Sequence, residues 1–146
     1  MADRPFLREG VIVMHAQVRQ GVPLVQVTIN RSRPLWFVLD SGSTRMIIDS
    51  RLLRELHLSA GEPLAVQGPG GDRSPAHRVR GLLRIGLDDA VSSGYAFDTF
   101  DLSAAAAILD HPIDGILGAQ FFDRFVVTID CQSSSVIARA RVLQQR

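Results

Sequence analysis

The sequence predicts a mainly β domain, built as a closed barrel or a folded sheet, with two or three short helices. Three observations support this fold class. Short apolar segments recur along the chain, and residues 25–29 alternate apolar and polar side chains at the period of a half-buried strand. Clusters of Gly, Pro, Asn and Ser separate these segments, as turns do. Short strands at such close spacing are typical of all-β domains.

The expected strands follow one another from the N-terminal part of the chain. An apolar run at residues 11–14 comes first, and the alternating segment at 25–29 follows a turn at Gln20-Gly21. Residues 35–39 are apolar throughout, which is typical of a strand buried on both faces. The apolar positions of residues 79–87 and the run ending at Ile129 complete the set.

Two segments favour helices, and a third could form one. Residues 51–58 place three leucines on one face, with Asp49 or Ser50 as the N-cap. Residues 102–109 are rich in Ala and Leu and end before a proline. A further helical turn is expected at residues 119–125. All of these elements fit one domain spanning residues 1–146.

The composition narrows the classes of partner. The chain is 46% hydrophobic and 21% charged, with a net charge of +1, which is ordinary for a globular domain of 146 residues. This charge gives no reason to expect nucleic acid or an anionic membrane as a partner. No segment has the length and apolarity of a signal peptide or a membrane span, so we expect a cytoplasmic protein.

The residues that are scarce or scattered exclude several chemistries. The chain has no lysine, which rules out Schiff-base catalysis and a Gly-Lys-Ser phosphate loop. Cys131 is its single cysteine, so no intrachain disulfide can form. His15, His57, His77 and His111 lack the spacing of metal ligands. We therefore expect no metal and no cofactor, and the absence of a Gly-x-Ser-x-Gly elbow argues against a serine hydrolase.

A polar motif, Asp40-Ser41-Gly42-Ser43-Thr44, follows the apolar run at 35–39 directly. A carboxylate buried at the end of such a strand is costly unless donors surround it or it keeps a proton. Ser41 and Ser43 can supply hydroxyl groups, and Gly42 allows a tight turn that brings its amide to the carboxylate. The pattern therefore indicates an acid–base group at Asp40. The alternative is an ordinary turn at the end of a strand.

A second motif, Ile113-Asp114-Gly115-Ile116-Leu117-Gly118, occurs later in the chain. Together with residues 37–44, its Ile116-Leu117-Gly118 segment resembles the retropepsin-like aspartic proteases. The likeness is strongest to the bacterial single-domain members and to the protease domain of the DNA-damage-inducible, ubiquitin-linked proteins, and it covers residues 11–141. It implies the acid-protease fold, Asp40 as the catalytic residue, and Ile116-Leu117-Gly118 packed beneath its loop. Asp114-Gly115 is interpreted as a turn.

The resemblance also implies supporting roles around Asp40. Ser41 stands where many members have Thr, and its hydroxyl would bond across a twofold axis and stiffen both loops. Gly42 would offer its amide to the carboxylates, and Ser43 would contact the outer oxygen of Asp40. These three residues are the predicted active-site support.

A glycine-rich segment, Gln67-Gly68-Pro69-Gly70-Gly71, is the candidate flap. A hairpin tip of this kind can open to admit a substrate and close to exclude water. It matches the family flap in glycine content and not residue by residue. The alternative is a plain exposed hairpin loop.

One carboxylate does not suffice for the reaction. Hydrolysis of a peptide bond without a metal or a nucleophile needs a base for the water and an acid for the substrate. The other candidates, Asp72, Asp88, Asp89 and Asp98, sit among polar or turn residues, and we expect them to be solvated. A second copy of the chain would supply the missing group, because a twofold axis brings identical residues together.

The sequence therefore predicts a homodimeric aspartic endopeptidase that acts on a peptide or protein substrate. Two Asp40 carboxylates, one from each subunit, would activate the water. The alternative is a catalytically silent retropepsin-like module for dimerisation or peptide binding. A generic β-barrel ligand binder would leave the Asp40 motif unexplained.

Overall fold

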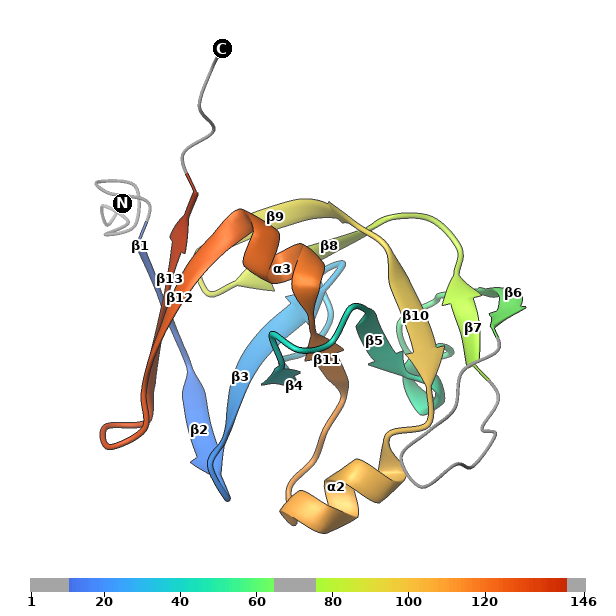
Figure 1. Ribbon diagram of the computed structural model, residues 1–146. Helices are drawn as coiled ribbons and strands as arrows, with labels where there is room; N and C mark the ends of the chain where they lie inside the picture. The colour runs from blue at the N-terminus through green and yellow to red at the C-terminus, as the bar shows by residue number, and fades with distance from the viewer. Residues whose placement is uncertain (1–10, 65–75, 142–146) are drawn as a thin grey trace.

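The computed structural model describes residues 11–64 and 76–141, and within them the chain is mainly β (Figure 1). The expected fold class is confirmed. A three-stranded sheet has the order β1-β13-β12, formed by β1 (Val11–Met14), β12 (Phe125–Asp130) and β13 (Ser135–Ala140). It lies at one side of the molecule, beside α3 (Ala119–Arg124). None of the helices in the described residues could span a membrane.

The remaining strands of the described residues form one larger, open sheet. Its order is β6-β7-β10-β5-β11-β4-β3-β8-β9, and β2 pairs with β3. The strands are β2 (Ala16–Arg19), β3 (Val22–Ile29), β4 (Leu35–Leu39), β5 (Met46–Asp49), β6 (Ala60–Leu64), β7 (Ala76–Val79), β8 (Leu83–Leu87), β9 (Ala90–Tyr95), β10 (Phe97–Phe100) and β11 (Gly115–Leu117).

The predicted turn at Gln20-Gly21 joins β2 and β3. Arg19 pairs with Val22, so the connection has two residues, and their φ angles are 50° and 79°. Positive φ at both central positions matches the right-handed twist of a hairpin, and glycine adopts it without a steric cost.

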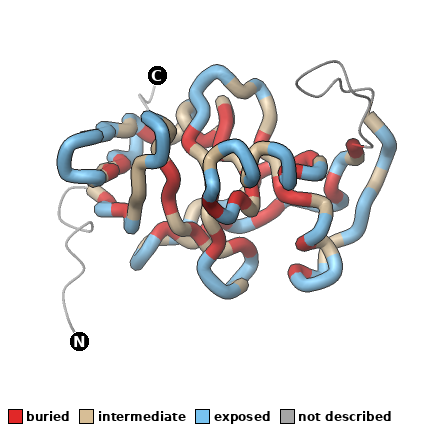
Figure 2. Tube along the Cα trace, turned by 90° about the horizontal axis from the view of Figure 1, so that it is seen from below, coloured by how far each residue is buried: buried red, intermediate tan, exposed pale blue. Residues whose placement is uncertain are grey.

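Two clusters of buried side chains stabilise the fold. The larger cluster contains Phe37, Phe97 and Leu117, together with Phe121 from α3. The smaller cluster is centred on Leu24, Leu102 and Ile113, and α2 (Ser103–Leu109) packs against it through partly buried Ala and Leu side chains. Figure 2 shows buried segments running through the middle of the molecule and exposed loops around them. Burial of this apolar surface is the main favourable term in folding.

The central strand β11 brings the two sequence motifs together. It pairs parallel with β4, where Leu117 faces Leu39, and antiparallel with β5, where Ile116 faces Ile47. Gly115 allows this close approach, since a Cβ atom there would lie 2.2 Å from the Phe37 ring. The segment Ile116-Leu117-Gly118 therefore does lie beside the strand that leads to Asp40.

The helix predictions were right at two places and wrong at the third. Helices α2 and α3 occupy the expected segments at 102–109 and 119–125. Residues 51–58 form a single 3-10 turn, η1 (Ser50–Leu52), followed by further turns. Asp49 caps this turn, but His57 has a φ of 55°, and Leu58 N–H donates back to Leu53 O at 2.8 Å. The chain reverses there, which ends the helix early.

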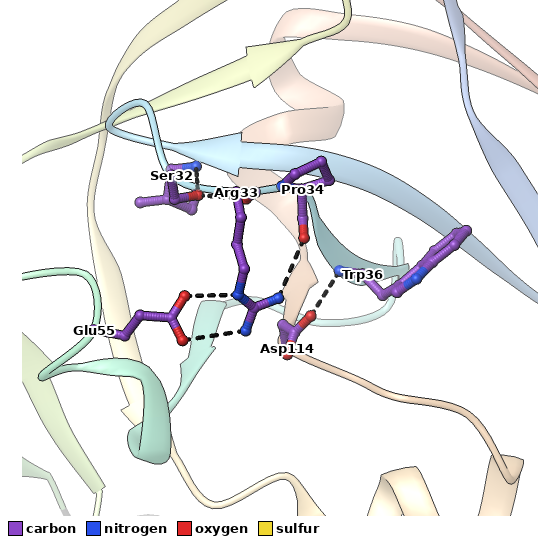
Figure 3. A network of polar contacts seen from close by, with 7 residues as sticks. Ser32, Arg33, Pro34, Trp36, Glu55 and Asp114 are labelled. Atoms are coloured by element: carbon purple, nitrogen blue, oxygen red, sulfur yellow. Dashed lines mark hydrogen bonds and ion pairs between the residues drawn. The ribbon is translucent and has the colours of Figure 1, made fainter.

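Asp114 does more than form a turn at the start of β11. Its Oδ2 accepts a hydrogen bond from the backbone N–H of Trp36 at 2.8 Å (Figure 3). The backbone N–H of Asp114 also donates to Trp36 O at 2.7 Å. Close by, Arg33 forms a two-pronged ion pair with Glu55, with Nε 2.7 Å from Oε2. These contacts fasten the beginning of β4, the end opposite Asp40.

Candidate active site

The Asp40 loop lies at the end of β4, where the strand leaves the central sheet. Asp40 N–H donates to Leu117 O at 3.0 Å, so the first residue of the loop is fixed to β11. Gly42 N–H donates to Oδ1 of Asp40 at 3.0 Å, in the tight turn that the sequence predicts. A Cβ atom at Gly42 would lie 3.3 Å from that same oxygen. The backbone therefore sets the direction of the carboxylate.

Ser43 closes the loop from the other side. Its N–H donates to Asp40 O at 3.1 Å, and its carbonyl accepts from Ala119 N–H at 2.8 Å. Its hydroxyl accepts from Arg45 N–H at 3.2 Å and donates to Arg45 O at 2.8 Å. The hydroxyl therefore contacts Arg45 and not the outer oxygen of Asp40, which was the predicted partner. Ser43 instead stabilises the exit of the loop.

Gly118 lies directly under the loop. Its N–H donates to the Sδ of Met46 at 3.1 Å. A Cβ atom there would come within 2.3 Å of Arg45 O and 2.7 Å of Ser43 O. Only a hydrogen atom fits between β11 and the loop, so the second motif acts through close backbone packing.

The exposure of the loop differs from the expectation. Asp40, Ser41 and Gly42 are exposed in the single chain, whereas the sequence suggested a buried carboxylate. Leu39 is buried and is the last residue of β4; Asp40 follows it and still donates its N–H to Leu117 O, but the residue itself is exposed. The chain therefore exposes Asp40 to solvent.

Asp98 is the carboxylate whose burial the sequence does not predict. It is buried on β10, with 9% of its surface exposed, and was expected to be solvated. Its Oδ2 lies 2.6 Å from Nη1 of Arg45, and its Oδ1 lies 3.8 Å from Nε of Arg78. No local pattern could reveal this, because Arg45 is distant in the sequence and β10 must first pair with β5.

A second buried carboxylate, Asp49, lies at the far end of β5. It is fully buried and accepts hydrogen bonds from the guanidinium of Arg51, with Nε 2.8 Å from Oδ2. This hydrogen bond raises the pKa of Arg51. Asp49 also caps η1, so its role is structural.

The remaining features lie away from Asp40 or outside the described residues. The candidate flap, Gln67-Gly68-Pro69-Gly70-Gly71, is outside the part of the chain that the structure describes. A cavity of about 600 Å³ opens between Arg33, Arg51 and α2, and its lining includes none of residues 40–45. Within residues 11–64 and 76–141, no three His, Cys, Asp or Glu side chains gather as metal ligands would.

The fold and the Asp40 loop together define an aspartic-protease type of domain. Residues 25–121 match the model of a family described as aspartyl protease, and this is more than half of the chain. The chain therefore belongs to the aspartyl protease family. No curated protein has a significantly similar sequence.

Solved structures show the same fold. A retropepsin-like aspartic protease from Rickettsia conorii is 15% identical, with a TM-score of 0.57, over 90% of this chain and 91% of that one. The retroviral protease-like domain of Ddi1 from Leishmania major is 16% identical, with a TM-score of 0.54, over 88% of this chain and 97% of that one. The chain thus has a retropepsin-like fold over nearly its whole length.

Proposed function

We propose that this chain is an aspartic endopeptidase whose active site forms between two copies of it. The observation that carries the proposal is an exposed Asp40, the first residue of a loop that hydrogen bonds hold to β11, in a chain of the aspartyl protease family. Each copy would contribute one Asp40 carboxylate to a site on a twofold axis. The exposure of the loop in one subunit fits this assembly, because the partner would cover it.

The other carboxylates near the central strands already interact with arginines or with the backbone. This supports a second acid–base group that comes from another copy of the chain. Asp98 is paired with Arg45, and Asp49 with Arg51. Asp114 accepts from the backbone at the opposite end of β4. None of these three is free to act as the second acid–base group.

The chemistry follows from two carboxylates placed side by side. As in aspartic proteases generally, two such groups cannot both ionise cheaply, so they share a proton and titrate as a pair. The ionised Asp40 would take a proton from the attacking water, and the protonated one would give its proton to the substrate. The two would exchange roles as the intermediate breaks down.

The residues beside Asp40 would prepare it for this task. Gly42 N–H already points at the carboxylate and would stabilise its ionised form. The exposed hydroxyl of Ser41 would bond across the axis, and Ser43 would keep the loop closed from below. Because these contacts exist before substrate binds, little reorganisation would be needed during the reaction.

The substrate would be an extended segment of a peptide or protein that lies between the two subunits. Binding as a strand uses backbone hydrogen bonds, with pockets for alternate side chains to set the preference. Residues 67–71 are proposed as the flap over this segment. No cofactor enters the scheme, since two carboxylates and one water suffice.

The test is the variant Asp40→Asn. Its amide oxygen can still accept from Gly42, so the fold and the dimer should survive while cleavage of a peptide library disappears. Asp88→Asn is the matched control, because Asp88 is an exposed aspartate in a turn with a φ of 54°, which asparagine tolerates. Cleavage that persists in pure Asp40→Asn protein would refute the proposal. An inactive parent that still dimerises would favour the silent module.

A further inference from the structure

We propose that Asp98 is a positioning residue that fixes the active-site loop through Arg45. This inference rests on the proposed function. It begins with an ion pair that joins a buried strand to the loop: Asp98 Oδ2 lies 2.6 Å from Arg45 Nη1. The side chain of Asp98 is 12% exposed and that of Arg45 is 40% exposed, so the carboxylate is the fixed end of the pair.

The register of the sheet explains why the two residues meet. Strand β10 runs parallel to β5, and Asp98 lies beside Ile47. Arg45 comes two residues before Ile47, on the side of β5 that is nearer to the Asp40 loop. Because alternate residues of a strand share a face, the side chains of Arg45 and Ile47 lie on the same face of the sheet. The carboxylate of Asp98 reaches along this face to the guanidinium.

Arg45 passes this constraint to the loop through its backbone. Its N–H and its carbonyl both contact the hydroxyl of Ser43, at 3.2 Å and 2.8 Å. Ser43 in turn donates to Asp40 O and accepts from Ala119. An unbroken series of contacts thus runs from Asp98 to Arg45, Ser43 and Asp40.

A second arginine makes the pairing sensitive to charge. Arg78 lies opposite Asp98 on β7, with Nε 3.8 Å from Oδ1. One carboxylate therefore faces two guanidinium groups. If Asp98 loses its charge, the two arginines repel each other with no anion between them, and these partly exposed side chains would turn towards water. Arg45 would then release the exit of the loop.

The experiment compares Asp98→Asn with the parent dimer, and Glu55→Gln serves as the matched control. Glu55 pairs with Arg33 at the opposite end of β4, so its loss removes an ion pair without touching the loop. In Asp98→Asn we expect kcat per active dimer to fall about tenfold to a hundredfold, with KM changed by less than about threefold. In Glu55→Gln both constants should stay at the parent level.

Amide hydrogen exchange gives a second readout that does not need activity. The N–H groups of Ser43, Arg45 and Ala119 should exchange about tenfold faster in Asp98→Asn, relative to the amides of β12 and β13 in the same protein. A merely structural role of Asp98 would raise the exchange rates of all amides together. The ratio in Glu55→Gln should match the parent.

Two further variants keep the proposal testable if Asp98→Asn does not fold. Arg45→Met leaves Asp98 with Arg78 and should lower kcat and loosen the same amides. Arg45→Lys retains the charge and should recover part of the lost rate. An unchanged kcat, or uniform exchange across loop and sheet, would overturn the role of Asp98. If the parent shows no Asp40-dependent cleavage, the proposed function fails, and the exchange ratio still decides whether Asp98 holds the loop.

Discussion

A methyl group added at Gly118 offers a quantitative test of how the two motifs fit together. The Cβ atom of Gly118→Ala would lie 2.3 Å from Arg45 O, 2.7 Å from Ser43 O and 3.0 Å from the carbonyl carbon of Arg45. All three neighbours are backbone atoms, so no flexible side chain can move aside. Ordinary contacts begin at 3.4 Å, so Arg45 O must retreat by about 1 Å.

Two effects follow from that displacement. Forcing an extra carbon into a packed site costs about 1–3 kcal/mol of unfolding free energy. A shift of about 1 Å in a catalytic loop costs about a hundredfold in rate. Gly118→Ala should therefore be moderately destabilised in urea unfolding and should lose most of its kcat on a peptide substrate.

Gly81→Ala is the control for this variant. Gly81 has a φ of 79° and open space around its Cα, so alanine there strains the backbone by about 1–2 kcal/mol without touching the loop. It should lose stability and keep its kcat. The packing argument is refuted if Gly118→Ala unfolds and turns over substrate like the parent.

Three other changes test contacts away from the loop. Asp114→Ala should cost about 1–3 kcal/mol in urea unfolding, because Trp36 N–H loses its acceptor, while Asp114→Asn, which keeps an oxygen, should cost less; equal losses would contradict this role. Arg51→Met should also lower the free energy of unfolding by about 1–3 kcal/mol, because the substitution leaves the buried carboxylate of Asp49 without a cation; this range allows for the exposure of Arg51. An unchanged midpoint of urea unfolding would show that Asp49 does not need the cation. Hydrogen bonds at the start of α2 lower the pKa of Asp101 in the folded protein. The ionised carboxylate therefore stabilises the fold fully at pH values above its unfolded pKa of about 3.9. This stabilisation is lost as the pH falls through the lower pKa of the folded protein. Asp101→Ala should thus lower Tm at pH 7, with a difference that shrinks in acid; a gap of constant size would contradict this assignment.

Local sequence carried enough information for the centre of the site. The apolar run at 35–39, the glycine at position 42 and the alternation at 25–29 each predict their structure from neighbouring residues alone. These features depend on strand periodicity and on turn geometry, which act over a few residues. The same holds for α2, whose four alanines have the highest intrinsic helix propensity of any residue type.

Features that depend on pairing between distant segments could not be predicted from the local sequence. Asp98 looks like a surface residue beside Thr99 until β10 lies against β5 and Arg45 reaches it. The exposure of Asp40 depends on where β4 ends relative to β11, and the early end of the 51–58 helix depends on the chain reversal at His57. Each outcome is decided by tertiary contacts, which local propensity does not contain.

A mixing experiment tests the proposed shared active site most directly. Parent subunits and Asp40→Asn subunits are unfolded together, refolded in varied proportions, and assayed at a fixed total concentration. If each site needs one Asp40 from each copy, the activity follows the square of the parent fraction, because mixed dimers are inactive. Activity that falls in simple proportion to the parent fraction would mean that one subunit is sufficient, and it would contradict the account.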